Sequence, residues 1–169
     1  MELDYCIKQL EDNAQRVRAL VEGVDEEQGR WKPDAESWSI LEVICHLLDE
    51  ERYDFRVRLD ITLNRADETW PDIDPEGWIS AREYNKQDLA TSLRSYMKER
   101  EASLVWLRSL KRADWEATYQ APWGPITAGD LLASWVAHDL LHMRQLVELH
   151  WYYNEAQVQP YRMLYAGEW

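Results

Sequence analysis

Apolar residues recur three and four positions apart along the first twenty residues of the chain. These positions are Leu3, Ile7, Leu10, Ala14, Val17 and Val21. On an α-helix they lie on one face. The spacing therefore predicts a helix over residues 3–21 whose apolar side faces the core of a bundle.

The stretch ESWSILEV marks the start of a second helix. Ser39 is a typical N-cap residue, and Glu42 three residues later completes a capping box, with Trp38 and Val43 placed as a hydrophobic staple. We expect this helix to continue to about residue 64. Its inward positions are Val43, His46, Glu50, Tyr53 and Val57.

Two proline-containing breaks delimit two more helices. In residues 65–80, RADETWPDIDPEGWIS, Pro71, Pro75 and Gly77 argue against regular helix, and we interpret the segment as a long connection. A helix over residues 82–111 follows. After the second break, QAPWGPI, Thr127 is the expected N-cap of a helix that runs to about residue 150. We expect the aromatic tail beyond it to pack over the bundle.

Four amphipathic helices and no competing strand pattern predict an all-α protein, a four-helix bundle formed by one domain over residues 1–169. The 65–80 connection could span ~50 Å when extended. A helix of 25 residues is ~38 Å long. The second and third helices can therefore run parallel, joined by a long crossover, which gives an up-down-down-up order.

Composition narrows the partners and the compartment. The formal net charge is −13, from 32 acidic and 19 basic residues, which argues against nucleic acid and anionic membrane surfaces as partners. No run of 18 apolar residues and no signal-peptide pattern occur. Cys6 and Cys45 are too few for a disulfide framework, and we expect both to be small core residues of a cytoplasmic protein.

Two of the four histidines, His138 and His142, lie one turn apart on the apolar face of the last helix. The residue after His138 is Asp139, so the HExxH motif of zinc proteases is not matched. His46 lies ~10 Å into the second helix, and His142 lies ~12 Å from the expected end of the last one. Antiparallel helices would bring the three imidazoles together. His150 falls ~12 Å further along, and we expect it at the surface.

The stretches WSILEVICHLLDEE and AHDLLHMRQL resemble the DinB-like, or YfiT-like, superfamily of four-helix bundles. This resemblance implies that His46, His138 and His142 hold one divalent metal ion, often zinc or nickel. It also implies a homodimer and a metal-dependent enzyme, with hydrolase and thiol S-transferase activities both represented in the family.

Three imidazole ligands leave a fourth position open, which is typical of catalytic zinc. Glu50, one turn after His46, has three candidate roles. It could accept a hydrogen bond from a ligand imidazole, act as general base for an activated water or thiol, or be a fourth ligand.

Arg100 interrupts the apolar stripe of the third helix. It could snorkel to the surface, pair with Glu50, or bind a substrate carboxylate near the metal. Two tryptophans have possible places at the pocket: Trp135, one turn before His138, could line it, and Trp123 could line an entrance.

We therefore expect a metal-dependent enzyme that acts on a small molecule. The resemblance favours thiol S-transfer or isomerisation, with a low-molecular-weight thiol as a candidate substrate, over hydrolysis. A non-enzymatic, stress-related metal-binding or scaffold bundle is the competing class.

Overall fold

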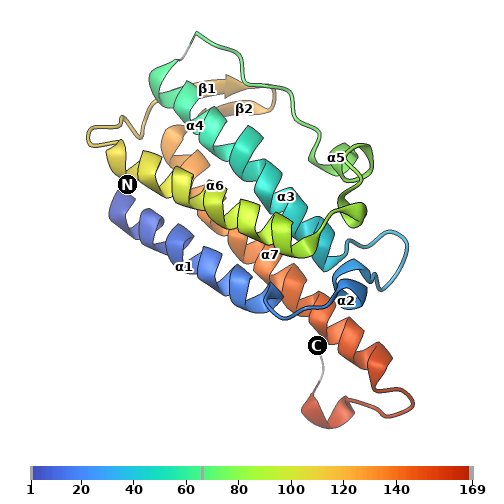
Figure 1. Cartoon of the computed structure of the whole chain (residues 1–169). Helices are drawn as coiled ribbons and strands as arrows, with labels where there is room; N and C mark the ends of the chain where they lie inside the picture. The colour runs from blue at the N-terminus through green and yellow to red at the C-terminus, as the bar shows by residue number, and fades with distance from the viewer. Residues whose placement is uncertain (1, 66, 168–169) are drawn as a thin grey trace.

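The computed structural model describes residues 2–65 and 67–167 and confirms the helical bundle. Its long helices are α1 (Leu3–Val21), α3 (Ile40–Tyr53), α4 (Phe55–Asn64), α6 (Leu89–Ser109) and α7 (Ala128–Gln157). In Figure 1, α1 and α7 run in one direction, while α6 and the α3–α4 pair run in the other. This is the predicted up-down-down-up order with its long crossover. No helix within the described ranges has the length and apolar character needed to cross a membrane.

Both predicted helix starts at the bundle's histidine-bearing elements are confirmed. The Ser39 hydroxyl accepts a hydrogen bond from the Glu42 amide at 3.2 Å, and the Glu42 carboxylate accepts one from the Ser39 amide at 2.7 Å. Thr127 and Asp130 form the equivalent reciprocal pair at the start of α7. Because each pair satisfies amides that the first helical turn leaves free, the caps fix where α3 and α7 begin.

The expected continuous helix from Ser39 to about residue 64 is interrupted at Asp54. This residue has φ −115° and ψ −94°, outside the helical region, and it separates α3 from α4. The Asp54 side chain is buried and forms an ion pair with Arg58 at 2.9 Å. A short carboxylate that finds partners near its own backbone competes with regular helix, which accounts for a break here.

The crossover is less irregular than predicted. A short helix, α5 (Pro75–Ala81), forms there, followed by the 3₁₀ turn η1 (Tyr84–Lys86). Pro75 occupies the first turn, where no amide donor is required, and the Asp74 carboxylate caps the helix by accepting from the Gly77 amide at 3.0 Å. The third long helix begins at Leu89 rather than near residue 82, because the Asp88 side chain caps it there.

The second break, predicted as a loop, forms a β-hairpin. Strands β1 (Thr118–Ala121) and β2 (Gly124–Thr127) pair antiparallel, with Ala121 opposite Gly124. Four-residue strands are too short for alternation to be visible in the sequence. A further short helix, α2 (Glu26–Arg30), was also not predicted.

The prediction that the C-terminal tail packs over the bundle is wrong for its described part. Helix α7 runs seven residues past its expected end, and the tail leaves the bundle (Figure 1). Tyr161 is 79% exposed and Leu164 is 71% exposed. Glu168 and Trp169 lie outside the described residues.

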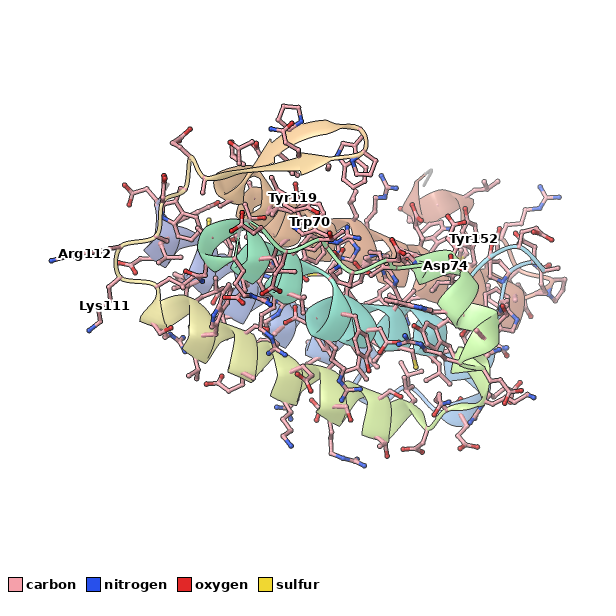
Figure 2. The ribbon with its side chains drawn as sticks, turned by 90° about the horizontal axis from the view of Figure 1, so that it is seen from above. Trp70, Asp74, Lys111, Arg112, Tyr119 and Tyr152 are labelled. Atoms are coloured by element: carbon pink, nitrogen blue, oxygen red, sulfur yellow. The ribbon has the colours of Figure 1, made fainter. Side chains whose placement is uncertain are left out.

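The crossover packs against the β-hairpin. Trp70 stacks on Tyr119 with ring centroids 4.1 Å apart, and the Trp70 amide donates to the Tyr119 hydroxyl at 2.9 Å. Arg58 of α4 donates to the Pro71 carbonyl at 3.3 Å. Figure 2 shows the chain passing alongside α4 and α3 from Trp70 to Asp74. The connection is thereby held close to the bundle.

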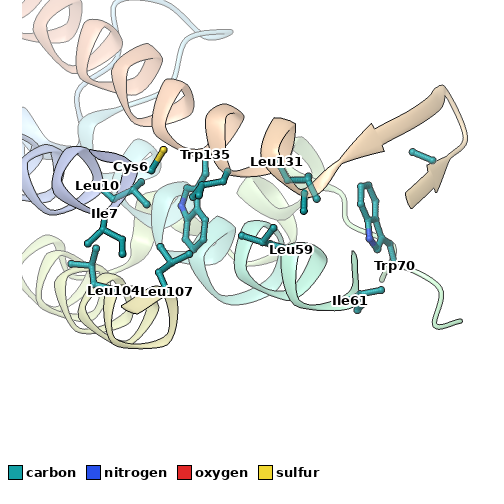
Figure 3. Close-up of a cluster of buried hydrophobic side chains, with 13 residues drawn as sticks. Cys6, Ile7, Leu10, Leu59, Ile61, Trp70, Leu104, Leu107, Leu131 and Trp135 are labelled. Carbon is teal, nitrogen blue, oxygen red and sulfur yellow. The ribbon is translucent and has the colours of Figure 1, made fainter. Parts of the chain in front are cut away.

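The core fills the space between the four helical positions. Around Trp135, a cluster of buried side chains joins α1, α4, α6 and α7 (Figure 3); its members include Leu10, Leu59, Leu104, Leu107 and Leu132. Cys6 and Cys45 are both buried and neither forms a disulfide, as expected for small core residues. Burial raises the pKa of the Cys45 thiol to about 11.

A buried ion network around Arg100 links all four positions of the bundle. Its Nε donates to Glu51 of α3 at 2.8 Å, and Nη1 and Nη2 donate to Asp139 of α7 at 2.7 and 2.8 Å. Nη1 also donates to the Leu10 carbonyl of α1 at 2.9 Å, and Nη2 lies 2.6 Å from Glu51. The Trp135 indole and the Ser103 hydroxyl complete the partners of Glu51.

The network corrects the predictions for Arg100. The residue does not snorkel to the surface, since it is only 1% exposed. Its carboxylate partner on α3 is Glu51, not Glu50. All the donor nitrogens of its guanidinium have partners, which leaves no edge for a substrate carboxylate. Arg100 therefore has a structural role, and the predicted role in substrate binding is wrong.

Replacing Arg100 by Met should destabilise the fold by about 3–5 kcal/mol, because it leaves the Glu51 and Asp139 carboxylates buried without their cation. Urea unfolding followed by circular dichroism measures the change. Arg94→Met, at an exposed site of the same helix, is the matched control and should cost less than about 0.5 kcal/mol. An Arg100→Met protein as stable as this control would contradict the assigned role.

Candidate metal centre

Three histidines from two antiparallel helices meet near the seam between α3 and α7. The Nε2 atom of His138 lies 3.2 Å from Nε2 of His46 and 3.1 Å from Nε2 of His142. The three candidate ligand atoms all lie within 4.8 Å of one another. His46 comes from α3, while His138 and His142 occupy successive turns of α7. The predicted meeting of the three imidazoles is found in the structure.

The electrostatics of the cluster suit a divalent cation. Burial lowers the pKa of His46 to about 3 and that of His138 to about 2, and it also lowers the pKa of His142. All three imidazoles are therefore neutral near pH 7, as metal ligation requires. Two imidazole nitrogens bound tetrahedrally to zinc at 2.0–2.1 Å are about 3.3 Å apart, close to two of the spacings observed.

A neighbouring polar group orients one of the rings, and a carboxyl lies near a second. Nδ1 of His142 lies 2.8 Å from Oε1 of Gln145. We infer that Nδ1 carries the proton and donates it, which leaves the Nε2 lone pair free for a cation. Nδ1 of His46 is buried and has no hydrogen-bond partner in the part of the chain that the structure describes; Oε1 of Glu50 lies 3.9 Å away. A small movement of the Glu50 side chain would complete the equivalent contact.

Aromatic rings surround the three imidazoles. Trp38 packs edge-on against His46 at 5.0 Å and stacks on His142 at 6.0 Å. Phe55 lies 5.1 Å from His138 and stacks on Trp135. Such packing holds ligand rings in place and limits access of water.

The sequence predicts a helix staple at Trp38 and no role for Phe55, yet both side chains contact candidate ligands. The WS pair before α3 was the available signal for Trp38. For Phe55 no signal existed, because its position depends on the break at Asp54. Trp123 is 70% exposed on the hairpin turn and contacts Trp70.

Glu50 is buried beside His46 and shares its surroundings with Asp54. Burial raises the pKa of Glu50 to about 9, and the nearby Asp54 charge adds to this effect. Burial also raises the pKa of Asp54, against the opposing influence of Arg58. Two carboxyls this close favour holding one proton between them. The pair can therefore store a proton one turn from the candidate ligands.

Two other predicted positions differ from expectation. Tyr53, expected to point inward, is 43% exposed. His150, expected at the surface near a helix end, is half-buried inside α7, where its Nε2 donates to the Leu20 carbonyl at 2.6 Å. Its Nδ1 lies 2.9 Å from Nε2 of Gln28. His150 thus lies outside the histidine cluster and has partners of its own.

Comparison with known proteins agrees with this architecture. The fold is similar to that of a solved structure described as "YfiT from Bacillus subtilis is a probable metal-dependent hydrolase with an unusual four-helix bundle topology". The TM-score is 0.77 at 21% sequence identity, over 88% of this chain and 85% of YfiT. No curated protein gives a significant match.

The family relationship rests on the sequence itself. The sequence model of the DinB superfamily matches residues 9–146. This range includes α3, the crossover and the part of α7 that carries His138 and His142. The chain therefore belongs to the DinB superfamily.

Proposed function

We propose that this protein is a divalent-metal-dependent enzyme that acts on a small molecule, with one cation held by His46, His138 and His142. The observation that carries the proposal is the convergence of three neutral imidazole nitrogens, two of them within 3.1–3.2 Å of the third. Without a cation or a shared proton, the lone pairs at such distances would repel one another. A cation bound there would act as a Lewis acid toward a water or a thiol.

Zinc and nickel are the proposed metals. Both accept imidazole ligands, and three protein ligands leave a position for substrate or water. Cys45 lies next to His46 in the sequence, but its Sγ faces the Tyr84 carbonyl and the Ser92 hydroxyl. It is therefore not proposed as a ligand.

Glu50 is proposed as the residue that takes up and returns a proton. Its buried carboxyl lies beside the ligands, and Oε1 has no hydrogen-bond partner among the described residues. A bound cation would lower the pKa of this carboxyl and favour its basic form. Asp54 then becomes the second site for the proton. A buried acid with a strongly shifted pKa next to a candidate metal site is typical of catalytic groups.

Transfer or isomerisation through a thiol is the proposed reaction class, from the family resemblance, with a low-molecular-weight thiol as co-substrate. Hydrolysis is the second candidate, favoured by the description of YfiT. Assays with glutathione, bacillithiol or mycothiol plus an electrophile, beside assays of ester and amide hydrolysis, separate the two. A metal-loaded protein inactive in all of them would favour the non-enzymatic alternative.

A homodimer is also proposed. The outward face of α7 exposes Leu140, Leu141 and Val147, which are 52%, 57% and 38% exposed. Apolar side chains gathered on one exposed helix face are typical of a subunit interface. Sedimentation equilibrium of the purified protein measures the state directly.

Alanine at His46, His138 or His142 should each abolish stoichiometric metal binding, because two imidazoles bind a divalent cation far more weakly than three. Elemental analysis of protein purified without chelator provides the measurement. His150→Ala is the control on the same helix and should retain one metal ion per chain. If the three variants keep the metal content of the wild type, the site is elsewhere.

Glu50→Gln should lower turnover by about 10²- to 10⁴-fold, the usual contribution of a general acid–base group, while metal content stays at one per chain. Glu99→Gln, at a carboxylate paired with Arg52 and Arg56 on the outside of the bundle, should leave turnover unchanged. Glu50 has no part in the mechanism if its glutamine variant keeps full activity.

The raised pKa of Glu50 should appear in the stability of the metal-free protein. The pKa of a glutamate in an unfolded chain is about 4.3, whereas burial raises the pKa of folded Glu50 to about 9. Between these values the native state holds a proton that the unfolded state has released. The free energy of unfolding of the wild type, relative to that of Glu50→Gln, should therefore fall with rising pH by up to about 1.4 kcal/mol per pH unit. Urea unfolding at pH 5.5, 7 and 8.5 tests this, and a difference that stays constant or grows would contradict it.

A further inference from the structure

A hollow of about 330 Å³ lies between α3, α4 and the crossover. Its lining includes Tyr53, Val57, Ile73, Trp78, Arg82 and the exposed Asp72. This volume is at the lower end of the range for small-molecule sites. The lining combines apolar and aromatic surface with one cationic group, the composition of a site for an amphiphilic small molecule.

The guanidinium of Arg82 is held in a fixed position in this hollow. Its Cζ lies 4.0 Å from the centroid of the Trp78 ring and 4.8 Å from that of Tyr53. Its Nη1 donates to Asp49, a buried carboxylate that also accepts from the Tyr84 hydroxyl at 2.6 Å. Rings and carboxylate together remove most of the freedom that an arginine side chain normally has.

Part of the guanidinium is still available. Among the described residues, neither Nε nor Nη2 of Arg82 has a hydrogen-bond acceptor, and the side chain is 36% exposed. A planar fork with a free edge matches the two oxygens of a carboxylate. Asp49 already balances the charge of Arg82, and Asp72 stands at the rim. A monoanion is therefore favoured over a dianion such as a phosphate monoester.

The hollow also has a defined relation to the candidate metal centre. Tyr53 follows His46 by seven residues and Glu50 by three on the same helix. Seven residues correspond to two turns, so Tyr53 lies ~10 Å further along the helix axis than His46. A molecule of roughly that length could reach both places.

We propose that this hollow binds the carboxylate end of the substrate, a small acid with an apolar or aromatic body, through the free edge of Arg82. The proposal deepens the proposed function and rests on it, because the bound acid is a substrate only if the protein is an enzyme. Arg82 acts in binding and specificity. The rings of Tyr53 and Trp78, together with Asp49, hold its guanidinium in the binding position before the ligand binds. Preorganisation of this kind reduces the entropic cost of binding.

The test compares 3-phenylpropanoate with its neutral analogue 3-phenylpropanamide. A carboxylate could also bind a metal ion directly, so binding is first measured with the metal-free His138→Ala protein. The Trp78 indole N–H signal, assigned with Trp78→Phe, reports binding in NMR titrations. We expect the acid to bind at least tenfold more tightly than the amide, and more tightly than phenyl phosphate. Equal affinities for acid and amide, or tighter binding of phenyl phosphate, would overturn the proposal.

Variants of Arg82 test whether its guanidinium is the group that binds the carboxylate. Arg82→Gln should remove the preference for the acid, whereas Arg94→Gln, at an exposed arginine of α6, should retain it. Because Asp49 loses its partner in Arg82→Gln, Arg82→Lys provides a second variant that keeps the charge and loses the planar fork. It should bind the acid several-fold more weakly than the parent protein. Unchanged binding in both Arg82 variants, or in the lysine variant if the other does not fold, would overturn the proposal.

The binding test and the activity assays can fail separately. A preference for the acid in the metal-free protein, without any turnover by the metal-loaded wild type, would support the hollow and contradict the proposed function. Turnover without any such preference would support the function and contradict the hollow.

Discussion

The antiparallel packing of α3 against α7 is the arrangement on which the candidate site depends. His46 belongs to one helix and His138 and His142 to the other, so the three nitrogens meet only when the helices have the right direction and register. The Glu51–Arg100–Asp139 network crosses the same region. Glu51 follows Glu50 on α3, and Asp139 follows His138 on α7. Buried ion pairs with full hydrogen bonding penalise sliding or rotation, because any shift leaves a charge without its partner.

This arrangement separates two kinds of charged group in the bundle. The carboxylates of Glu51 and Asp139 have complete sets of partners and hold the helices together. Glu50, one residue before Glu51, lies beside the histidines instead. Its Oε1 has no hydrogen-bond partner within the described ranges, and burial raises its pKa. Neighbouring residues on one helix point in directions about 100° apart, so one turn of α3 contributes both to the framework and to the candidate metal centre.

The sequence predicted much of this from periodicity and capping. The helix starts at Ser39 and Thr127 and the first helix followed from local signals. The bundle order followed from the length of the 65–80 connection, and the inward stripes identified the three histidines. The predicted meeting of His46 and His142 is confirmed, although one of the two depths behind that prediction is wrong. The depth of His142 was measured from an expected helix end near residue 150, whereas α7 ends at Gln157, fifteen residues after His142. The antiparallel direction of the two helices, more than the number of residues between His142 and the helix end, brings the imidazoles together.

The remaining differences arise where tertiary contacts override local pattern. Arg100 could not be assigned from its place in a stripe, because its partners come from three other helical segments. Phe55 reaches His138 only because the chain breaks at Asp54. The site at Arg82 is assembled from α3, α4, α5 and the crossover, whose proximity no spacing in the sequence reveals.

Anomalous X-ray scattering from a crystal of protein purified without chelators tests the central claim most directly. Data collected on both sides of the zinc and nickel absorption edges locate and identify the ion in one measurement. The account predicts one peak at bonding distance from the Nε2 atoms of His46, His138 and His142. A peak elsewhere, or none in protein whose three imidazoles are intact, would contradict it.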